Sequence, residues 1–272
     1  MTKNKQNKYQ NYAYSIKKYF DKSSNSLCLV TKDNIESKYI YNELSFLIKN
    51  NLIHIFPEND ILPYDHFSIP EDITKQRFQL INNKSKDKHI LISSVKNLFE
   101  IFPDRYFFKS EKTFSINDEL SIDRIIKIVE SLNYQKITNV EKINEYSVRG
   151  GIIDVFSPIY KSPLRIEIFD DHIESIRLFD IESQLSIKNI NQFSISKGNL
   201  YSLDNLKVSS FINKWRDYFP DIDERYCSIF QKIKNNKVPE GIEIYFPFFF
   251  EKISTFLDIF NDYNFIKYHD LS

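Results

Sequence analysis

The stretch EYSVRGGIIDVFSPIYKSPLRIEIFDDHIESIRLFDIESQLSI, residues 145–187, decides the fold. It contains three β-rich runs, at residues 146–156, 164–169 and 173–179. Two Ser-Pro pairs separate the first two runs, because proline cannot donate a hydrogen bond to a β-ladder. An Asp-Asp pair separates the last two, and aspartate tolerates the left-handed geometry of tight turns. The spacing predicts an antiparallel meander.

Alternation along the middle run predicts two different faces for this sheet. The apolar residues at 164, 166 and 168 point one way and are expected to pack, whereas Arg165, Glu167 and Phe169 point the other way. A large aromatic side chain beside an arginine on a polar face is typical of an interface anchor. Alternation alone equally allows Phe169 to be a core residue and the arginines to be solvated.

Two of the four glycines, Gly150 and Gly151, directly follow Arg149. We expect this pair to shift the register of the first strand as a β-bulge does, and to swing Arg149 onto the same outer face. Arg149 and Arg165 would then offer forked donors to a partner, while Phe169 fills an apolar pocket. These three residues are the predicted partner-binding site.

The fold class is predicted as α/β with three domains. Residues 1–110 alternate β and α segments, which favours a mostly parallel sheet covered by helices. Residues 111–196 form an α+β domain whose helix, 122–132, covers the inner face of the meander with one apolar stripe. Residues 197–272 are predicted to be helical and aromatic-rich, to pack back on the first domain, and to be truncated at the chain end.

The first and last domains contain shorter predicted elements. Those of the first domain are strands at 27–30, 53–56 and 89–93, helices at 35–48, 71–81 and 95–102, and a turn at 62–65. In the last domain, residues 206–219 and 226–233 have helical spacing, and 246–250 is a dense aromatic cluster.

Composition and motifs argue against several classes of function. Lys and Arg balance Asp and Glu at 37 each, so binding of nucleic acid mainly through phosphates is not expected. No glycine follows the first strand, which excludes a phosphate-binding loop. The two cysteines and five histidines show no metal spacing, and His172 is interpreted as polarity at a hairpin tip. We therefore expect no enzyme, cofactor or metal site.

No apolar run reaches the ~20 residues of a membrane span. The polar N-terminus also lacks the apolar core of a signal peptide. These features predict a soluble, cytoplasmic protein.

Several stretches also resemble a known family. SVRGGIIDVF (147–156), PLRIEIFDDHIESIRLFDIESQ (163–184) and LPYDHFSIPEDI (62–73) are similar to the N-terminal, UvrB-homologous module of the bacterial transcription-repair coupling factor (Mfd). NKWRDYF (213–219) and VPEGIEIYFPFFF (238–250) extend the similarity over nearly the whole chain. The resemblance implies a degenerate helicase-like first domain, without the ATP site and DNA-gripping hairpin of UvrB. It also implies a middle domain that docks onto UvrA, with the family's contacts falling on Arg149, Arg165 and Phe169.

The leading hypothesis is a non-catalytic interaction module of transcription-coupled nucleotide excision repair that recruits UvrA through an exposed sheet face. One alternative is the N-terminal part of an ATP-dependent DNA translocase whose motor lies beyond Ser272. Another is a UvrB-like DNA-damage-binding protein, which the zero net charge argues against. DNA binding is expected to be weak or absent. In a longer protein, the remaining coupling-factor domains and RNA polymerase are further expected partners.

Overall fold

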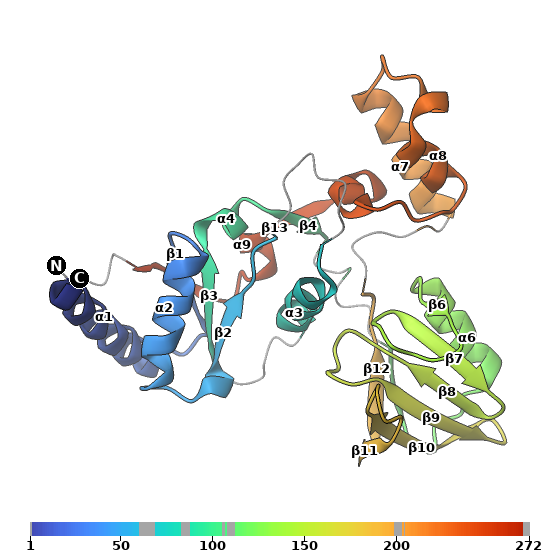
Figure 1. Cartoon of the computed structure of the whole chain (residues 1–272), viewed down its shortest axis with the longest axis horizontal. Coiled ribbons are helices and arrows are strands. Elements are labelled where there is room, and N and C mark those ends of the chain that lie inside the picture. Colours follow the sequence, from blue (N-terminus) through green and yellow to red (C-terminus); the bar gives the residue numbers. More distant parts are fainter. Residues whose placement is uncertain are drawn as a thin grey trace. The chain divides into compact units, whose positions relative to one another are not determined.

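A computed structural model of the protein describes residues 2–59, 69–82, 88–104, 107, 112–198, 203 and 205–268, without the side chains of residues 2–11, 71 and 205. The described residues divide into two compact units (Figure 1). The first draws on residues 1–60, 83–102 and 254–272, and the second on 61–82 and 103–253. The expected turn at 62–65 and most of the 62–73 motif lie outside the described residues.

The first unit is built on a parallel four-stranded sheet in the order β14-β1-β3-β2. Its elements are α1 (Thr2–Lys22), β1 (Leu27–Thr31), α2 (Asn34–Ser45), the 3-10 helix η1 (Asn50–Leu52), β2 (Ile53–Phe56), β3 (Ile90–Ser94), α4 (Val95–Leu98), β4 (Ile101–Pro103), β13 (Ile253–Thr255), α9 (Phe256–Ile259) and β14 (Asn264–Lys267). Apolar residues of α1 and α2, such as Ile16 and Leu44, pack against β1 and β3. The predicted mostly parallel sheet covered by helices is confirmed.

The second unit contains a six-stranded sheet in the order β11-β10-β9-β8-β7-β6, antiparallel except between β6 and β7. The sheet consists of β6 (Gln135–Lys136), β7 (Glu145–Arg149), β8 (Ile152–Val155), β9 (Leu164–Phe169), β10 (His172–Phe179) and β11 (Ser186–Asn189), and helix α6 (Ile122–Ser131) lies beside it. The strands β5 (Lys112–Ser115) and β12 (Gln192–Ile195) pair with each other in a separate two-stranded sheet. The meander predicted from residues 145–187 is confirmed.

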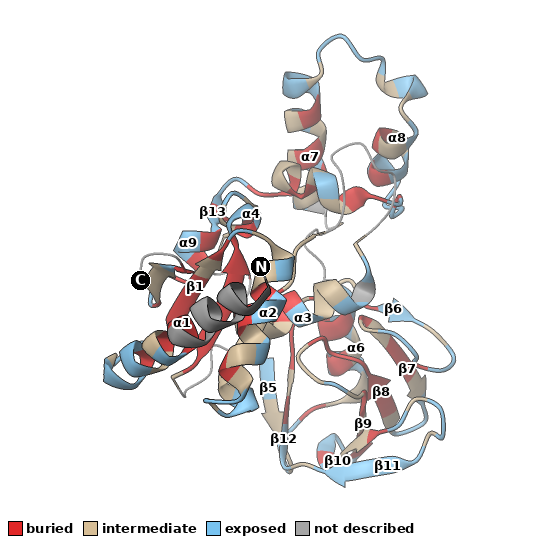
Figure 2. Cartoon of the chain, turned by 60° about the vertical axis from the view of Figure 1, so that its left-hand side comes forward, coloured by how far each residue is buried: buried red, intermediate tan, exposed pale blue. Residues whose placement is uncertain are grey.

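Helix α6 covers one face of this sheet. Ser121 caps the helix by accepting a hydrogen bond from the Arg124 N–H, and Ile125 and Val129 are fully buried one turn apart. They pack against sheet residues such as Ile153 and Ile166, and Figure 2 shows this buried interior along the strands. The apolar stripe therefore places the core on one side of the sheet, as predicted.

The two glycines behave differently from the prediction of a bulge. They form the turn of a hairpin between β7 and β8, so the run 146–156 is two strands and not one. Gly150 has φ +62°, a backbone conformation that costs glycine little. At Gly151, a Cβ atom would lie 2.7 Å from the Ile168 carbonyl oxygen on β9. A larger residue at 151 would therefore push the neighbouring strand away.

The Asp-Asp turn of the next hairpin is as predicted. Asp170 and Asp171 have φ of 48° and 58°, so both central residues are left-handed, as a type I′ turn requires. This turn connects β9 directly to β10 and keeps the two strands antiparallel.

Two further parts complete the second unit. Helix α3 (Glu71–Asn82) contacts the loop after β8, where Gln79 donates to the Pro158 carbonyl and the Lys75 ammonium lies 4.4 Å from the Phe156 ring centroid. The helical part consists of α7 (Asn205–Tyr218), η2 (Glu224–Tyr226), α8 (Ser228–Lys234) and η3 (Ile242–Phe249). The predicted aromatic cluster contacts α7, where Phe249 stacks on Phe211 with ring centroids 5.1 Å apart, and it also contacts Phe107, whose ring centroid lies 5.0 Å from that of Phe250.

Three secondary-structure predictions need correction. The helix expected at 95–102 is the short α4 followed by β4, and α1 at the N-terminus was not predicted. The segment 197–272 is not helical throughout, because β14 pairs in parallel with β1. An edge strand of four residues carries too little periodic signal to be separated from a helix in sequence.

None of the helices in the described part of the chain combines the length and apolar character of a membrane span.

Candidate docking face of the six-stranded sheet

Strand pairing puts the three predicted residues on the face of the sheet opposite α6. Asp154 on β8 is the cross-strand partner of Arg165 on β9, and Arg149 on β7 is the cross-strand partner of Ile152 on β8. Direct partners on neighbouring strands share a face, and so do residues two apart on one strand. Arg149, Arg165 and Phe169 therefore lie together. We call this surface the outer face; its residues are Arg149, Ile152, Asp154, Arg165, Glu167, Phe169, Ser175 and Arg177.

Asp154 is the centre of the outer face, and its side chain is only 1% exposed. Arg149 donates from Nη2 to Asp154 Oδ2 at 2.7 Å. Arg165 donates from Nε to Oδ1 at 2.8 Å and from Nη2 to Oδ2 at 2.9 Å. A bidentate pair fixes the plane of the guanidinium group as well as its position. One carboxylate therefore orients both arginines and leaves the trio with one net positive charge.

Arg165 makes more contacts within the domain, and is less exposed, than the sequence predicted. Beyond Asp154, its Nη1 and Nη2 donate to the backbone and side-chain oxygens of Gln184 at 3.2 Å, and its guanidinium lies 4.3 Å from the Phe179 ring centroid. The hydrogen bonds to Asp154 raise the pKa of Arg165. Its side chain is 17% exposed. The prediction that Arg165 offers its fork to a partner is corrected, because Asp154 already occupies that fork.

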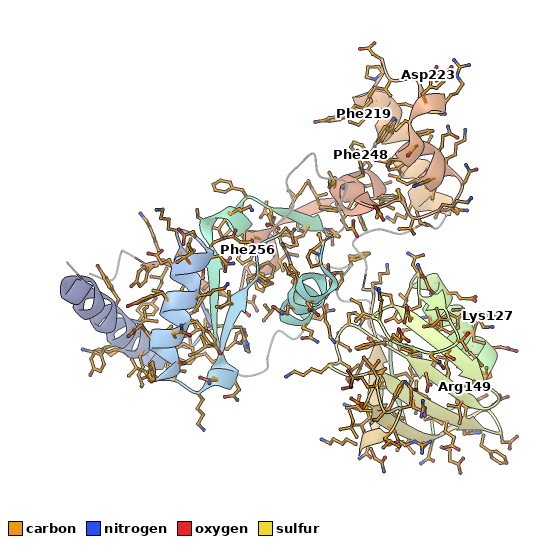
Figure 3. All side chains as sticks on the ribbon, viewed as in Figure 1. Lys127, Arg149, Phe219, Asp223, Phe248 and Phe256 are labelled. Carbon is orange, nitrogen blue, oxygen red and sulfur yellow. The ribbon has the colours of Figure 1, made fainter. Side chains whose placement is uncertain are left out.

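Arg149 has the opposite character. Its side chain is 51% exposed at the end of β7 (Figure 3). Apart from the bond to Asp154, its guanidinium makes no hydrogen bond to any residue that the structure describes. Arg149 is therefore anchored at one nitrogen and keeps its other donors for a partner.

Phe169 is 73% exposed at the last position of β9. The alternative that placed it in the core is excluded. Phe169 lies where β9 ends and the turn to β10 begins, and its cross-strand partner is the exposed His172, the first residue of β10. A phenylalanine left mostly in water forgoes much of the ~1.5–3 kcal/mol that full burial would supply. The ring therefore has a thermodynamic reason to bind an apolar surface.

The structure adds features that the sequence did not reveal. Asp154 was not predicted, although a carboxylate inside the apolar run GIIDVF was a usable signal. Glu167 accepts hydrogen bonds from Ser175 and Arg177 at 3.0 and 2.8 Å, so the strip between Arg149 and Phe169 is internally neutralised. Leu185, just before β11, and Ile187, within β11, are exposed and add apolar surface at the sheet edge. Figure 2 shows β11 as an exposed strand.

His172 fits the interpretation of a hairpin tip. Its Nδ1 lies 2.7 Å from the Asp170 carbonyl oxygen, and the side chain is exposed. Within the described residues, no group of three or more His, Cys, Asp or Glu side chains is arranged to hold a metal ion.

Comparison with known proteins shows which domain model the outer face is similar to. Residues 113–201 match the model described as the UvrB interaction domain. We refer to residues 113–201 as the UvrB interaction domain, after the model that they match. In this chain, therefore, the UvrB interaction domain contains α6, the six-stranded sheet and the whole outer face.

Similarity to known proteins extends beyond the UvrB interaction domain. The transcription-repair-coupling factor of Haemophilus influenzae is 27% identical over 248 residues, which cover 90% of this chain and 22% of that protein. The one of Escherichia coli is 25% identical over 234 residues, covering 85% of this chain and 20% of that protein. The chain thus spans about a fifth of the length of these relatives. Together, the domain match and these relatives support an N-terminal module of the transcription-repair coupling factor.

Proposed function

We propose that the UvrB interaction domain docks onto UvrA through its outer face, and that the chain serves transcription-coupled nucleotide excision repair as a non-catalytic recruitment module. One observation carries the proposal. A 73% exposed phenylalanine shares a sheet face with an arginine whose position is fixed by a buried carboxylate. Aromatic and arginine side chains are enriched among the residues that dominate binding energy. The family match supports the choice of UvrA as the partner.

The residues of the outer face have different roles in this proposal. Phe169 is the apolar anchor that enters a pocket of UvrA. Arg149 donates to a carboxylate or carbonyl oxygen of the partner, since a guanidinium group suits bidentate recognition. Asp154 and Arg165 act as the frame that holds Arg149 in place, so a partner meets a preorganised surface and spends less entropy on binding.

Binding of purified UvrA to the Phe169→Ala variant tests the anchor. We expect affinity to fall about 30-fold or more, because truncation of a central aromatic anchor typically costs ~2 kcal/mol or more. The melting temperature should stay unchanged, since the ring contributes little to the core. Isothermal titration measures the first quantity and circular dichroism the second.

Phe46→Ala is the matched control, because Phe46 is an 85% exposed phenylalanine at the end of α2, outside the UvrB interaction domain. It should bind UvrA as the wild type does. Equal affinity of the wild type and the Phe169→Ala variant would rule out the proposed anchor.

We also propose that the chain hydrolyses no nucleotide. Between β1 and α2 only Lys32 and Asp33 intervene, and the Asp33 carboxylate accepts a hydrogen bond from the Glu36 N–H. A phosphate-binding loop would need open backbone N–H groups at this helix start, and the carboxylate would repel a phosphate there. Purified protein should release no phosphate from ATP above a buffer blank, with or without DNA; sustained turnover would contradict the proposal.

The proposed setting is the cytoplasm. If the chain acts within a longer coupling factor, the remaining domains of that protein and RNA polymerase are the further partners that we propose. The two other functions considered, a translocase front and a UvrB-like damage sensor, gain no specific support from the outer face, which carries an anchor for protein and no stripe of cations.

A further inference from the structure

A second site lies on the other side of the UvrB interaction domain, between β5 and α6. A cavity of about 440 Å³ opens there. This volume is in the range of small-molecule sites. Helix α6 covers the inner face of the sheet, and none of the residues that line the cavity belongs to the outer face. The cavity plays no part in the function proposed above.

The cavity is strongly cationic. Lys112 on β5 and Arg124 and Lys127 on α6 line it, and no Asp or Glu does. Such clustering is unexpected in a chain with equal numbers of basic and acidic residues. Lys112 and Lys127 form no ion pair with any described residue. Among the described residues, the Arg124 guanidinium donates one hydrogen bond, from Nη1 to the Glu119 carbonyl oxygen at 3.4 Å.

Part of the wall is apolar. Phe114 on β5 and Ile128 on α6 also line the cavity. Phe114 is half-buried, and the buried Phe193 of β12 stacks on it with ring centroids 5.3 Å apart. Phe114 is thus a rigid aromatic surface beside three cations. An aromatic platform next to positive charge is the combination with which proteins bind the base and the phosphate of a nucleotide.

The surroundings favour a compact ligand. Asp123 and Glu130 are exposed on α6, within one turn of Arg124 and Lys127 in sequence. These carboxylates interrupt the positive surface along the helix. An extended nucleic-acid strand would need a continuous cationic track, whereas a single nucleotide needs only the cavity.

We propose that this cavity binds one nucleotide unit, with the phosphate held by Lys112, Arg124 and Lys127 and the base against Phe114. The unit comes either from a free nucleotide or from the phosphorylated end of a single strand. Both sources share the same chemistry, a phosphate monoester attached to an aromatic base.

Titration of the whole chain with adenosine 5′-monophosphate in low salt tests the proposal. We expect saturable binding with a dissociation constant below about 1 mM, and this binding should weaken when NaCl is added. Adenosine, which lacks the phosphate, should bind at least tenfold more weakly. Lys127→Glu should weaken the monophosphate about tenfold, because attraction becomes repulsion at short range. Lys136→Glu is the control, since Lys136 is an exposed cation on β6 outside the cavity.

Further variants and ligands separate the parts of the site. Phe114→Leu should weaken the monophosphate and leave binding of inorganic phosphate unchanged, after circular dichroism has verified its fold. A 5′-phosphorylated dT12 that binds more tightly than the monophosphate identifies a strand end as the source, and the reverse order identifies a free nucleotide. UvrA binding should not respond to Lys127→Glu, so failure here and failure of the docking proposal are distinguishable.

Three results would overturn the inference. They are an absence of saturable monophosphate binding, equal weakening by Lys127→Glu and Lys136→Glu, and binding of hexaglutamate that competes with the monophosphate, is tighter than the monophosphate and is weakened by Lys127→Glu. The last of these would reassign the cavity to an acidic peptide.

Discussion

Asp154 shows how a single buried charge can shape a binding surface. It stands between Val155 and Ile153 in a strand whose other residues are apolar, and water reaches almost none of its side chain. A buried carboxylate without partners would be expensive, and here two guanidinium groups compensate it. The side chain of Arg165 is mostly buried in this pairing, whereas the side chain of Arg149 remains half-exposed.

The Asp154→Ala variant tests this interpretation through stability. Removing the carboxylate leaves Arg165, which is mostly buried, without its counter-charge, so we expect the free energy of unfolding to fall by roughly 2–4 kcal/mol. Arg165→Ala should also destabilise the chain and lower its melting temperature. Arg149→Ala removes an ion pair in which the arginine is half-exposed, so the free energy of unfolding should fall by less than about 1 kcal/mol. Urea denaturation measures all three.

The order of these three effects is the decisive result. If Arg149→Ala destabilises the chain as much as Asp154→Ala does, Asp154 would not be the frame of the outer face, and Arg149 would be a structural residue. UvrA affinity of the Arg149→Ala variant would then no longer report a direct contact.

At the scale of the elements, His54 and His89 form a pair of neighbouring rings beside the strands β2 and β3 of the first unit. The rings of His54 on β2 and His89, just before β3, have centroids 5.5 Å apart, and the Tyr263 hydroxyl lies 2.6 Å from His89 Nε2. Burial lowers the pKa of His54, and the nearby His89 lowers it further. Folding therefore disfavours the charged form of His54.

This pair predicts a loss of stability in mild acid. The unfolded chain takes up a proton on His54 near its ordinary pKa of about 6.5, while the folded chain does so only at lower pH. Between these values the unfolded state binds more protons, so the free energy of unfolding decreases as pH falls below about 6.5. The melting temperature should drop less between pH 7.5 and 5.5 in His54→Gln than in the wild type.

His172→Gln serves as the control for the acid effect, because His172 lies at an exposed hairpin tip. It should follow the wild-type curve. An identical drop in the His54→Gln and wild-type proteins would assign the acid sensitivity to other groups.

At the scale of the whole molecule, the two compact units are interleaved along the chain. Residues 254–272 belong to the first unit, where β14 extends the sheet beside β1, and residues 61–82 group with the second. The predicted domains, 1–110, 111–196 and 197–272, follow one another in sequence. Parallel pairing accepts a strand from anywhere in the chain, so a sequence-ordered division cannot anticipate the return of β14.

Much of the local structure of the UvrB interaction domain could be predicted from short-range signals in the sequence, although the turn at Gly150 and Gly151 could not. Proline and aspartate positions predicted the turns, period-two alternation predicted the outward position of Arg165 and Phe169, and the apolar stripe of α6 predicted the covered face. These signals are local, because each depends on the geometry of a few consecutive residues.

Tertiary structure alone decided what the side chains on that face do. Asp154 meets Arg149 only because Gly150 and Gly151 form a hairpin turn and not a bulge. Arg165 meets Gln184 only because β10 pairs antiparallel with β9 and leads into the turn that contains Gln184. The cationic cavity likewise needs β5 beside α6. Which charges pair, and which remain exposed to a ligand, depends on distances between strands and turns that the fold brings together, and alternation carries no information about those distances.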